Sequence, residues 1–242
     1  MQIIRANERG FTKLNWLKSY HSFSFGDYYN PENKGFNSLR VINDDLIEAK
    51  SGFDFHPHHD MEILTIVLKG AVTHIDSMGN SETIYADEFQ LMSAGTGIMH
   101  SEHNLENEEL RLLQIWIKPE TKGLVPSYHK KSLKQLSKNT VGLYNIASPL
   151  SSKHKESSLK INQNIEINLY KGPEKGELIK LANTQGLDLY IHQISGELNI
   201  YGDGEHLDLK LSAGDGAYLN SLKNLSLESF PASEFLVFNF QP

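Results

Sequence analysis

Cysteine is absent from the 242 residues of this chain. Its absence excludes disulfides, catalysis by a thiolate, and zinc or iron–sulfur sites held by cysteine. A metal ion bound by this protein must therefore be held by nitrogen and oxygen atoms.

Long apolar runs and blocks of positive charge are missing as well. No stretch approaches the roughly 18 apolar residues of a membrane span, and the segment 1–9 lacks the apolar core of a secretory signal. The 23 basic and 30 acidic residues give a net charge of -7, without a dense Lys/Arg block to bind phosphates. We therefore expect a cytoplasmic protein with no membrane partner and no direct contact with nucleic acid.

Helical patterns are scarce, and short β-rich runs take their place. From Leu39 onward such runs recur about every 8–12 residues, separated by Gly, Asn, Asp or Pro, which is typical of a β-sandwich or barrel. The pattern weakens between Lys118 and Lys160, where prolines and a polar, serine-rich stretch predict a connector. A short helix is expected near Lys131–Gln135. The sequence therefore predicts an all-β protein with two domains.

Two pairs of potential metal ligands stand out in a chain with 11 histidines. His56 and His58 form the first pair, and His100 and Glu102 form the second, each with one residue between its members. Because residues i and i+2 of a strand point to the same face, each pair can aim two donors at one point. The runs between the pairs have strand composition, and Gly95–Gly97 allows a tight turn before the second pair. Two such strands facing each other predict a cage of four ligands.

The predicted ligand set limits the metal and suggests its chemistry. Three imidazoles and one carboxylate suit Fe, Mn, Co, Ni, Cu or Zn, and the set does not choose among them. We expect one divalent transition metal and place Fe(II) first, because the set resembles the facial triad of oxygen-activating iron sites with one more histidine. Four protein ligands leave positions open for substrate, as a catalytic site requires. Glu102 is also predicted to act as a general base that takes the proton of a substrate hydroxyl.

The second half of the chain looks like a diverged copy of the first. Leu68–His74 aligns with Ile194–Ile200. In this register the first ligand pair corresponds to Ala182 and Thr184, and the second pair falls near Ser226–Phe230, where there is no histidine. The second domain is therefore predicted to bind no metal and to have a structural role.

At this point the chain resembles a known family. The spacings Gly52-x3-His56-x-His58-x3-Glu62-x7-Gly70 and Gly97-x2-His100-x3-Asn104 look like the two cupin motifs. More narrowly, four stretches look like the pirin family: His21–Tyr29, Leu39–Asp45, Ser93–Glu102 and Leu113–Ile117. The resemblance is dense over residues 1–128 and looser over the rest.

The pirin resemblance implies a fold of two tandem cupin (double-stranded β-helix) domains. We predict an N-terminal metal-binding cupin domain over 1–128, a connector over 129–160, and a degenerate, metal-free C-terminal cupin domain over 161–242. The resemblance also implies that the ligand carboxylate comes from the second motif. Glu62, in the first motif, is therefore expected beside the ligands and not on the metal.

The same resemblance implies an activity. Bacterial pirin-like proteins include quercetin 2,3-dioxygenases, which open the central ring of a flavonol with O2 and release carbon monoxide. We therefore predict a monomeric enzyme of this type, with a small aromatic substrate and O2 as its partners. Two alternatives stay open: a metal-dependent regulator that binds another protein, as other pirins do, and a cupin enzyme that acts on an unrelated small molecule.

Other residues near the ligand pairs are weaker candidates. His59 and His103 lie an odd number of positions from the nearest ligand, so both are predicted to point away from the metal. An aromatic pocket mouth and plain core are the two interpretations of a further set: His21, Phe23, Phe25, Phe53, Phe55 and Met99. No role is assigned to the isolated histidines His74, His129, His154, His192 and His206.

Overall fold

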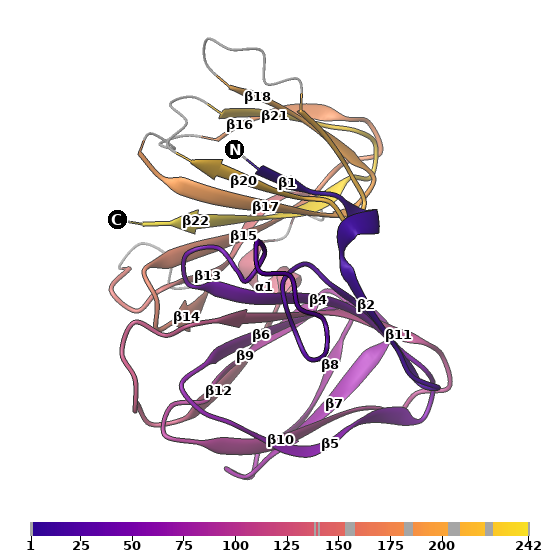
Figure 1. Cartoon of the computed structure of the whole chain (residues 1–242), viewed down its shortest axis with the longest axis vertical. Helices are drawn as coiled ribbons and strands as arrows, with labels where there is room; N and C mark the ends of the chain where they lie inside the picture. Colours follow the sequence, from indigo (N-terminus) through magenta and orange to yellow (C-terminus); the bar gives the residue numbers. More distant parts are fainter. Residues whose placement is uncertain are drawn as a thin grey trace. The chain divides into compact units, whose positions relative to one another are not determined.

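The computed structural model describes residues 2–137, 139, 141–152, 158–181, 186–202, 209–220 and 225–241. These residues form mainly strands, with two short helical segments, η1 (Ala6–Glu8) and α1 (Leu133–Leu136) (Figure 1). The prediction of an all-β protein is confirmed, and α1 overlaps the expected short helix. No helix in this described part of the chain is long and apolar enough to cross a membrane.

Contacts divide the chain into two compact units. The N-terminal unit consists of Arg9–Leu133 with Leu159–Gln163, and the C-terminal unit consists of Met1–Glu8, Lys134–Ser158 and Asn164–Pro242. The sequence instead predicted continuous segments over 1–128, 129–160 and 161–242. The segment predicted as a connector contains strand residues of β12, β13 and β14, together with α1. Patterns along the sequence do not show which strands pair, and strand pairing decides which segments form a unit. The three ranges stay a prediction.

The N-terminal unit contains two antiparallel sheets. The larger sheet has the order β12-β9-β6-β11-β4-β3-β2, and the smaller has the order β5-β10-β7-β8. The larger sheet is formed by β2 (Gly10–Lys13), β3 (Leu17–His21), β4 (Leu39–Ile47), β6 (Glu62–Lys69), β9 (Glu88–Ser93), β11 (Leu110–Ile117) and β12 (Ser127–Ser132). The smaller is formed by β5 (Ser51–His58), β7 (Ala71–Asp76), β8 (Ser81–Tyr85) and β10 (Ile98–Asn104). The short β14 (Leu159–Ile161) also belongs to this unit.

Buried side chains of this unit form layers along the strands. On β6, Ile63 belongs to one apolar cluster and Val67 to another, and the fully buried Thr65 lies between them. Gln90 of β9 and Gln114 of β11, on the two neighbouring strands, both contact Thr65. Burying polar groups is costly unless they are hydrogen-bonded. The polar layer of Thr65, Gln90 and Gln114 between two apolar clusters therefore indicates the position of a functional site.

The turn before β10 explains Gly95, one of the glycines that the sequence singled out. Gly95 has φ +46, and a Cβ at this position would overlap the backbone of Leu124. Any other residue would therefore strain the backbone and collide with it. The turn sets the start of β10, which carries His100 and Glu102.

The C-terminal unit repeats this arrangement. Its smaller sheet has the order β16-β21-β18-β19, and the strands of its larger sheet run β1-β20-β17-β22-β15-β13. The larger sheet comprises β1 (Gln2–Ile4), β13 (Gly142–Pro149), β15 (Ile165–Lys171), β17 (Asp188–Ser195), β20 (Gly216–Asn220) and β22 (Glu234–Phe240). The smaller comprises β16 (Glu177–Leu181), β18 (Glu197–Gly202), β19 (Leu209–Ser212) and β21 (Leu225–Ser229).

The predicted internal repeat is confirmed at its anchor. Gly70 joins β6 to β7 with φ 80, and Gly196 joins β17 to β18 with φ 70. Both glycines therefore make the same left-handed turn between equivalent strands. The alignment of Leu68–His74 with Ile194–Ile200 superposes these two turns.

Candidate metal centre

Three of the four predicted ligands come together in the N-terminal unit. His56 and His58 lie on β5 and His100 lies opposite on β10, with His100 paired to His56 and Ile98 paired to His58. The ring centroids are 4.8 Å apart for His56 and His58, 4.4 Å for His56 and His100, and 4.9 Å for His58 and His100. One nitrogen of each ring lies within 4.8 Å of the others, which suits a shared metal ion.

A bulge in β5 determines which side chains face this cluster. The ladder between β5 and β10 shifts register, so that His100 pairs with His56 while Glu102 pairs with Phe53. The extra residue leaves Phe53 and His56 facing inward and turns Phe55 outward, where it is 52% exposed. Within the bulge, His56 Nδ1 lies 2.8 Å from the Asp54 carbonyl oxygen. Since Nδ1–H donates to that oxygen, Nε2 keeps its lone pair for a metal.

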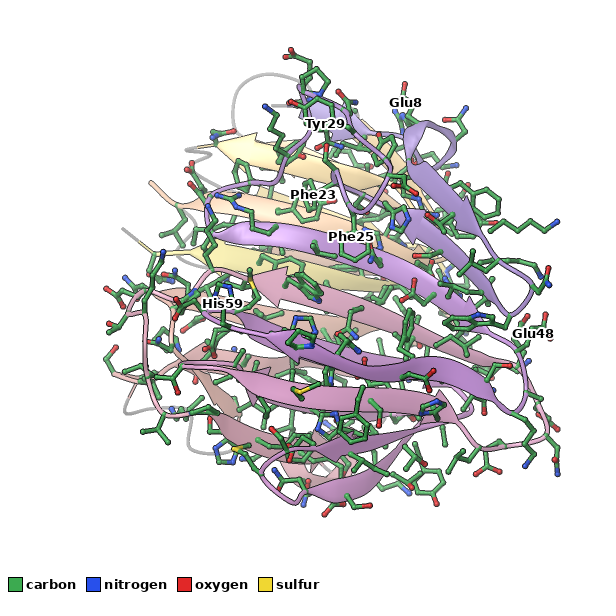
Figure 2. All side chains as sticks on the ribbon, turned by 60° about the horizontal axis from the view of Figure 1, so that its bottom comes forward. Glu8, Phe23, Phe25, Tyr29, Glu48 and His59 are labelled. Carbon is green, nitrogen blue, oxygen red and sulfur yellow. The ribbon has the colours of Figure 1, made fainter. Side chains whose placement is uncertain are left out.

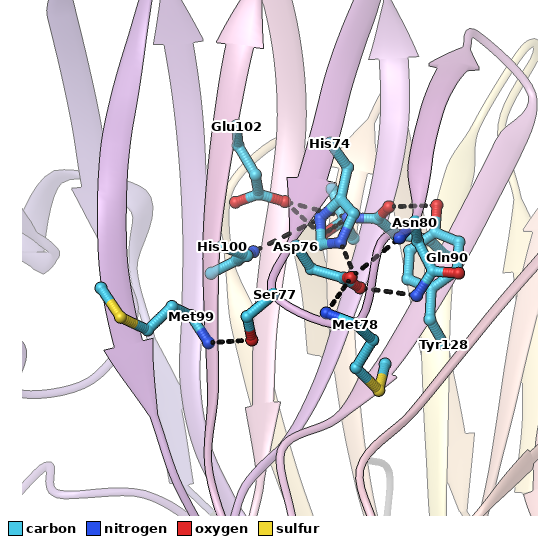
Figure 3. A network of polar contacts seen from close by, with 11 residues as sticks. His74, Asp76, Ser77, Met78, Asn80, Gln90, Met99, His100, Glu102 and Tyr128 are labelled. Carbon is cyan, nitrogen blue, oxygen red and sulfur yellow. Dashed lines mark hydrogen bonds and ion pairs between the residues drawn. The ribbon is translucent and has the colours of Figure 1, made fainter.

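His100 is held by a buried relay that the sequence did not predict. His100 Nδ1 lies 3.3 Å from His74 Nδ1, and His74 Nε2 lies 3.3 Å from Asp76 Oδ2 (Figure 3). Burial acts to raise the pKa of Asp76, but hydrogen bonds from Asn80, His74 and Met78 lower it overall, so this carboxylate stays charged. His74 then donates to Asp76 and accepts from His100 Nδ1–H. The relay thus fixes the ring of His100 and leaves its Nε2 without a proton.

The Nε2 nitrogen of His100, which the relay leaves without a proton, is available to a metal ion. His100 Nε2 is buried and has no hydrogen-bond partner among the described residues. An unpaired buried nitrogen is costly, and a metal ion would satisfy it. Burial, followed by the charges of neighbouring histidines, lowers the pKa of His58 to about 4 and that of His100 to about 3. Both rings are therefore neutral at pH 7, as metal binding requires, and the donors fit a divalent transition metal.

Glu102 lies beside the histidine cluster but does not join it. Its carboxylate groups with His74 and His100, and it is 2% exposed. Gln114 Nε2 donates to its Oε2 at 2.7 Å, and Gln90 Nε2 donates to its Oε1 at 2.9 Å. Tyr128, whose pKa burial raises well above the usual range, donates to Gln90 Oε1 at 2.8 Å and so orients that amide. The carboxylate is therefore fixed in place by the polar layer.

A cavity of about 330 Å³ opens beside the histidines. Phe25, Phe53 and Trp116 give it apolar walls, and His56, His58 and Glu102 also line it. Trp116 packs edge-on against both His58, at 4.9 Å between ring centroids, and Phe25, at 5.4 Å. Phe25 lies on the segment between β3 and β4, with Tyr29 further along it (Figure 2). A cavity of this size with aromatic walls suits a small planar ligand.

Some of the weaker candidates line the cavity, and others do not. His21, Phe25 and Phe53 line the cavity, whereas Phe23 is buried elsewhere and Met99 is exposed. As predicted, His59 and His103 point away from the cluster: His59 is exposed beside Asp60, and His103 pairs with the exposed Asp54.

Glu62, which was expected beside the ligands, belongs to neither cluster of potential ligands among the described residues, and the same is true of His129 and His192. Glu62 accepts hydrogen bonds from Ser93 Oγ and from the backbone nitrogen of Asn162. His129 is exposed on β12, and His192 is buried in the C-terminal unit. Four residues singled out in the sequence lie outside the described residues: His154, Ala182, Thr184 and His206.

Comparison with known proteins agrees with this architecture. Residues 4–117 match the Pirin family, and residues 147–240 match the family described as Quercetinase C-terminal cupin domain. A quercetin 2,3-dioxygenase of Escherichia coli (strain K12) is 42% identical over 244 residues, covering 98% of this chain and 97% of the relative.

Solved structures give the same result. A bacterial pirin from Escherichia coli in complex with nickel(II) has a TM-score of 0.89 at 41% identity, over 100% of this chain and 99% of that chain. A quercetin 2,3-dioxygenase from Acinetobacter baumannii, with a TM-score of 0.73 at 20% identity over 100% of this chain and 86% of that chain, shares the fold. The chain therefore belongs to the pirin family of two-domain cupin proteins.

Proposed function

We propose that this protein is a metal-dependent dioxygenase that cleaves a flavonol such as quercetin with O2 and releases carbon monoxide. The observation that carries the proposal is the convergence of the His56, His58 and His100 imidazoles beside a cavity with aromatic walls. The relative named quercetin 2,3-dioxygenase supports the same substrate.

His56, His58, His100 and Glu102 are the proposed ligands of one divalent ion, with Fe(II) first and Ni, Co, Mn, Cu or Zn as alternatives. The unpaired Nε2 of His100 and the neutral state of two of the rings support this assignment. When bound, the ion supplies Lewis-acid activation of a substrate oxygen and a place for O2.

Glu102 is the proposed base. It accepts the proton of the flavonol hydroxyl, while Gln90 and Gln114 hold its two oxygens in a fixed plane. Phe25, Phe53 and Trp116 contact the faces of the substrate and keep water away. Both atoms of O2 enter the products, two carbon–carbon bonds of the central ring break, and the carbon between them leaves as carbon monoxide.

The proposal also covers the location, oligomeric state and partners of the enzyme. The enzyme acts in the cytoplasm as a monomer, on a small aromatic substrate and without nucleic acid. The net charge of -7 supports the absence of phosphate contacts.

The test is an assay of quercetin consumption by protein purified without an affinity tag. Quercetin should persist without O2 and disappear in air, with carbon monoxide detected by its complex with reduced myoglobin. His100→Ala should abolish consumption, whereas the matched control His59→Ala, an exposed neighbour of His58, should retain it. Equal consumption by His100→Ala and the wild type would refute the proposal.

A further inference from the structure

A second polar wall lines the same cavity, on the larger sheet of the N-terminal unit. It consists of five residues from three neighbouring strands: Thr12, Ser19, His21, Asn43 and Asp45. Ser19 pairs with both Thr12 and Asp45 across the strands, and His21 pairs with Asn43. These side chains therefore share one face of the sheet. His56 and His58 belong to the other sheet, so polar groups from both sheets meet in one cavity.

His21 is hydrogen-bonded to its neighbours in this wall. His21 Nδ1 lies 2.8 Å from Asn43 Oδ1, and His21 Nε2 lies 2.8 Å from Thr12 Oγ1. Burial lowers the pKa of His21, so the ring is neutral, donates from Nδ1 to the amide oxygen, and accepts from the threonine hydroxyl. Both ring nitrogens of His21 are therefore already paired within the wall.

Asp45 is the exception in this wall. It is 3% exposed, and its Oδ1 has no hydrogen-bond partner among the described residues. Burial raises its pKa to about 7, while a hydrogen bond from Ser19 acts in the opposite direction and the charges of Asp44 and Glu102 add to the rise. A buried carboxyl oxygen without a partner is destabilising, and a ligand that donates a hydrogen bond would remove that cost.

We propose that Asp45 forms a second binding subsite, which accepts a hydrogen bond from a hydroxyl of a polyhydroxylated aromatic substrate. The inference rests on the proposed function and narrows its substrate class. The preferred flavonol carries a further hydroxyl beyond the one that Glu102 deprotonates. The aromatic walls formed by Phe25, Phe53 and Trp116 contact the ring system, and the two carboxylates engage different hydroxyls of the same molecule.

The experiment compares quercetin, which is polyhydroxylated, with 3-hydroxyflavone, which has only the ring hydroxyl. The value of kcat/KM for each is measured with the wild type, Asp45→Ala and Asp45→Asn. Asp45→Ala should lower kcat/KM for quercetin by about 10–100-fold and that for 3-hydroxyflavone by less than about 3-fold. Asp45→Asn keeps an acceptor oxygen and should lose less of the preference.

Glu62→Gln is the matched control. Glu62 is also a buried carboxyl with a pKa raised by burial, but it contacts Ser93 and Asn162 and does not line the cavity. This variant should keep the wild-type ratio of the two kcat/KM values. An equal fall for both substrates in Asp45→Ala, or no fall for either, would overturn the subsite.

Binding without O2 separates this inference from the proposed function. Quenching of tryptophan fluorescence reports binding, because Trp116 lines the cavity. If the wild type binds quercetin better than 3-hydroxyflavone, Asp45→Ala removes the difference, and neither compound is consumed in air, the subsite stands and the dioxygenase proposal falls. If quercetin is consumed in air and Asp45→Ala keeps the wild-type preference, the subsite falls and the dioxygenase proposal stands. A wild type that binds neither compound overturns both.

Discussion

The smaller sheets of the two units have the same strand order. At equivalent positions, the N-terminal sheet carries polar side chains and the C-terminal sheet carries apolar ones. In the N-terminal unit Glu102 of β10 pairs with His74 of β7, and in the C-terminal unit Leu227 of β21 pairs with Ile200 of β18. The pair of His100 and His56 likewise corresponds to Leu225 and Leu181, so the predicted alignment of His56 with Ala182 is wrong by one residue. One backbone arrangement therefore supports either a polar centre or an apolar core.

The difference shows what a buried polar centre needs. Leu225 and Leu227 join a continuous apolar cluster of the C-terminal unit and require only close packing. His100 and Glu102 instead require partners from several strands, namely His74, Gln90 and Gln114. The site is thus encoded as much by its supporting residues as by its proposed ligands. The metal-free state of the C-terminal unit stays a prediction.

The largest expected effect comes from replacing a polar side chain of the N-terminal centre by the apolar residue of the C-terminal unit. His100→Leu places the residue of the C-terminal unit at the equivalent position of the N-terminal unit. Metal affinity should fall by more than the roughly 10–100-fold typical of losing an outer partner, because a proposed ligand is lost. Metal content by elemental analysis measures the effect, and retention of one full equivalent would contradict the assignment.

A core substitution in the C-terminal unit tests the other half of the comparison. Leu227→Ala removes a fully buried side chain of the C-terminal core and should lower the free energy of unfolding by roughly 2–5 kcal/mol. Denaturant unfolding measures this loss. The metal content should equal that of the wild type. If Leu227→Ala also loses metal, metal binding is not a property of the N-terminal unit alone.

Removal of a supporting residue should have an intermediate effect. His74→Ala deletes the acceptor of His100 Nδ1–H and should weaken metal binding by about 10–100-fold. Competition with a chelator measures the affinity. Thr73→Ala, on the same strand but only half-buried, serves as the control and should bind like the wild type. If His74→Ala also binds like the wild type, the relay has no part in holding the metal.

The smallest expected effect is a pH dependence specific to the polar unit. The pKa of Asp45 is raised from 3.8 to about 7, mainly by burial. Between these values the native state keeps a proton that the unfolded state releases, so this group makes the free energy of unfolding fall as pH rises from about 4 to 7. In metal-free protein, Asp45→Asn should therefore gain free energy of unfolding relative to the wild type as pH rises across this window.

Thermal unfolding at several pH values checks this gain. The exposed Asp54→Asn variant is the control and should follow the wild type at every pH. A constant difference between Asp45→Asn and the wild type, independent of pH, would mean that Asp45 does not titrate as stated.

Much of the site could be predicted from local sequence, because alternation along a strand is a local property. The spacing of His56, His58 and His100 and the glycine turn at Gly95 needed no knowledge of distant strands. Alternation failed at one place: Phe53 and Phe55 were considered together, but the bulge in β5 separates their faces. A bulge depends on the partner strand, so the sequence of β5 alone did not indicate it.

The supporting residues were missed for a related reason. Gln90, Gln114 and Asp45 lie on β9, β11 and β4, far from the ligand pairs in sequence, and only strand pairing brings them to the site. A local signal did exist for His74, because Val72, His74 and Asp76 alternate on one face of β7. The N-terminal strand β1, which pairs with β20, was likewise hidden, because pairing between such distant segments leaves no periodic pattern.

The central claim is that one metal ion is held by the imidazoles of residues 56, 58 and 100 together with the carboxylate of Glu102. Anomalous diffraction from crystals of protein purified without an affinity tag tests it most directly. The account predicts a single strong peak within about 2.0–2.2 Å of all four side chains. A metal bound elsewhere on the chain, with these four side chains free of it, would contradict the account.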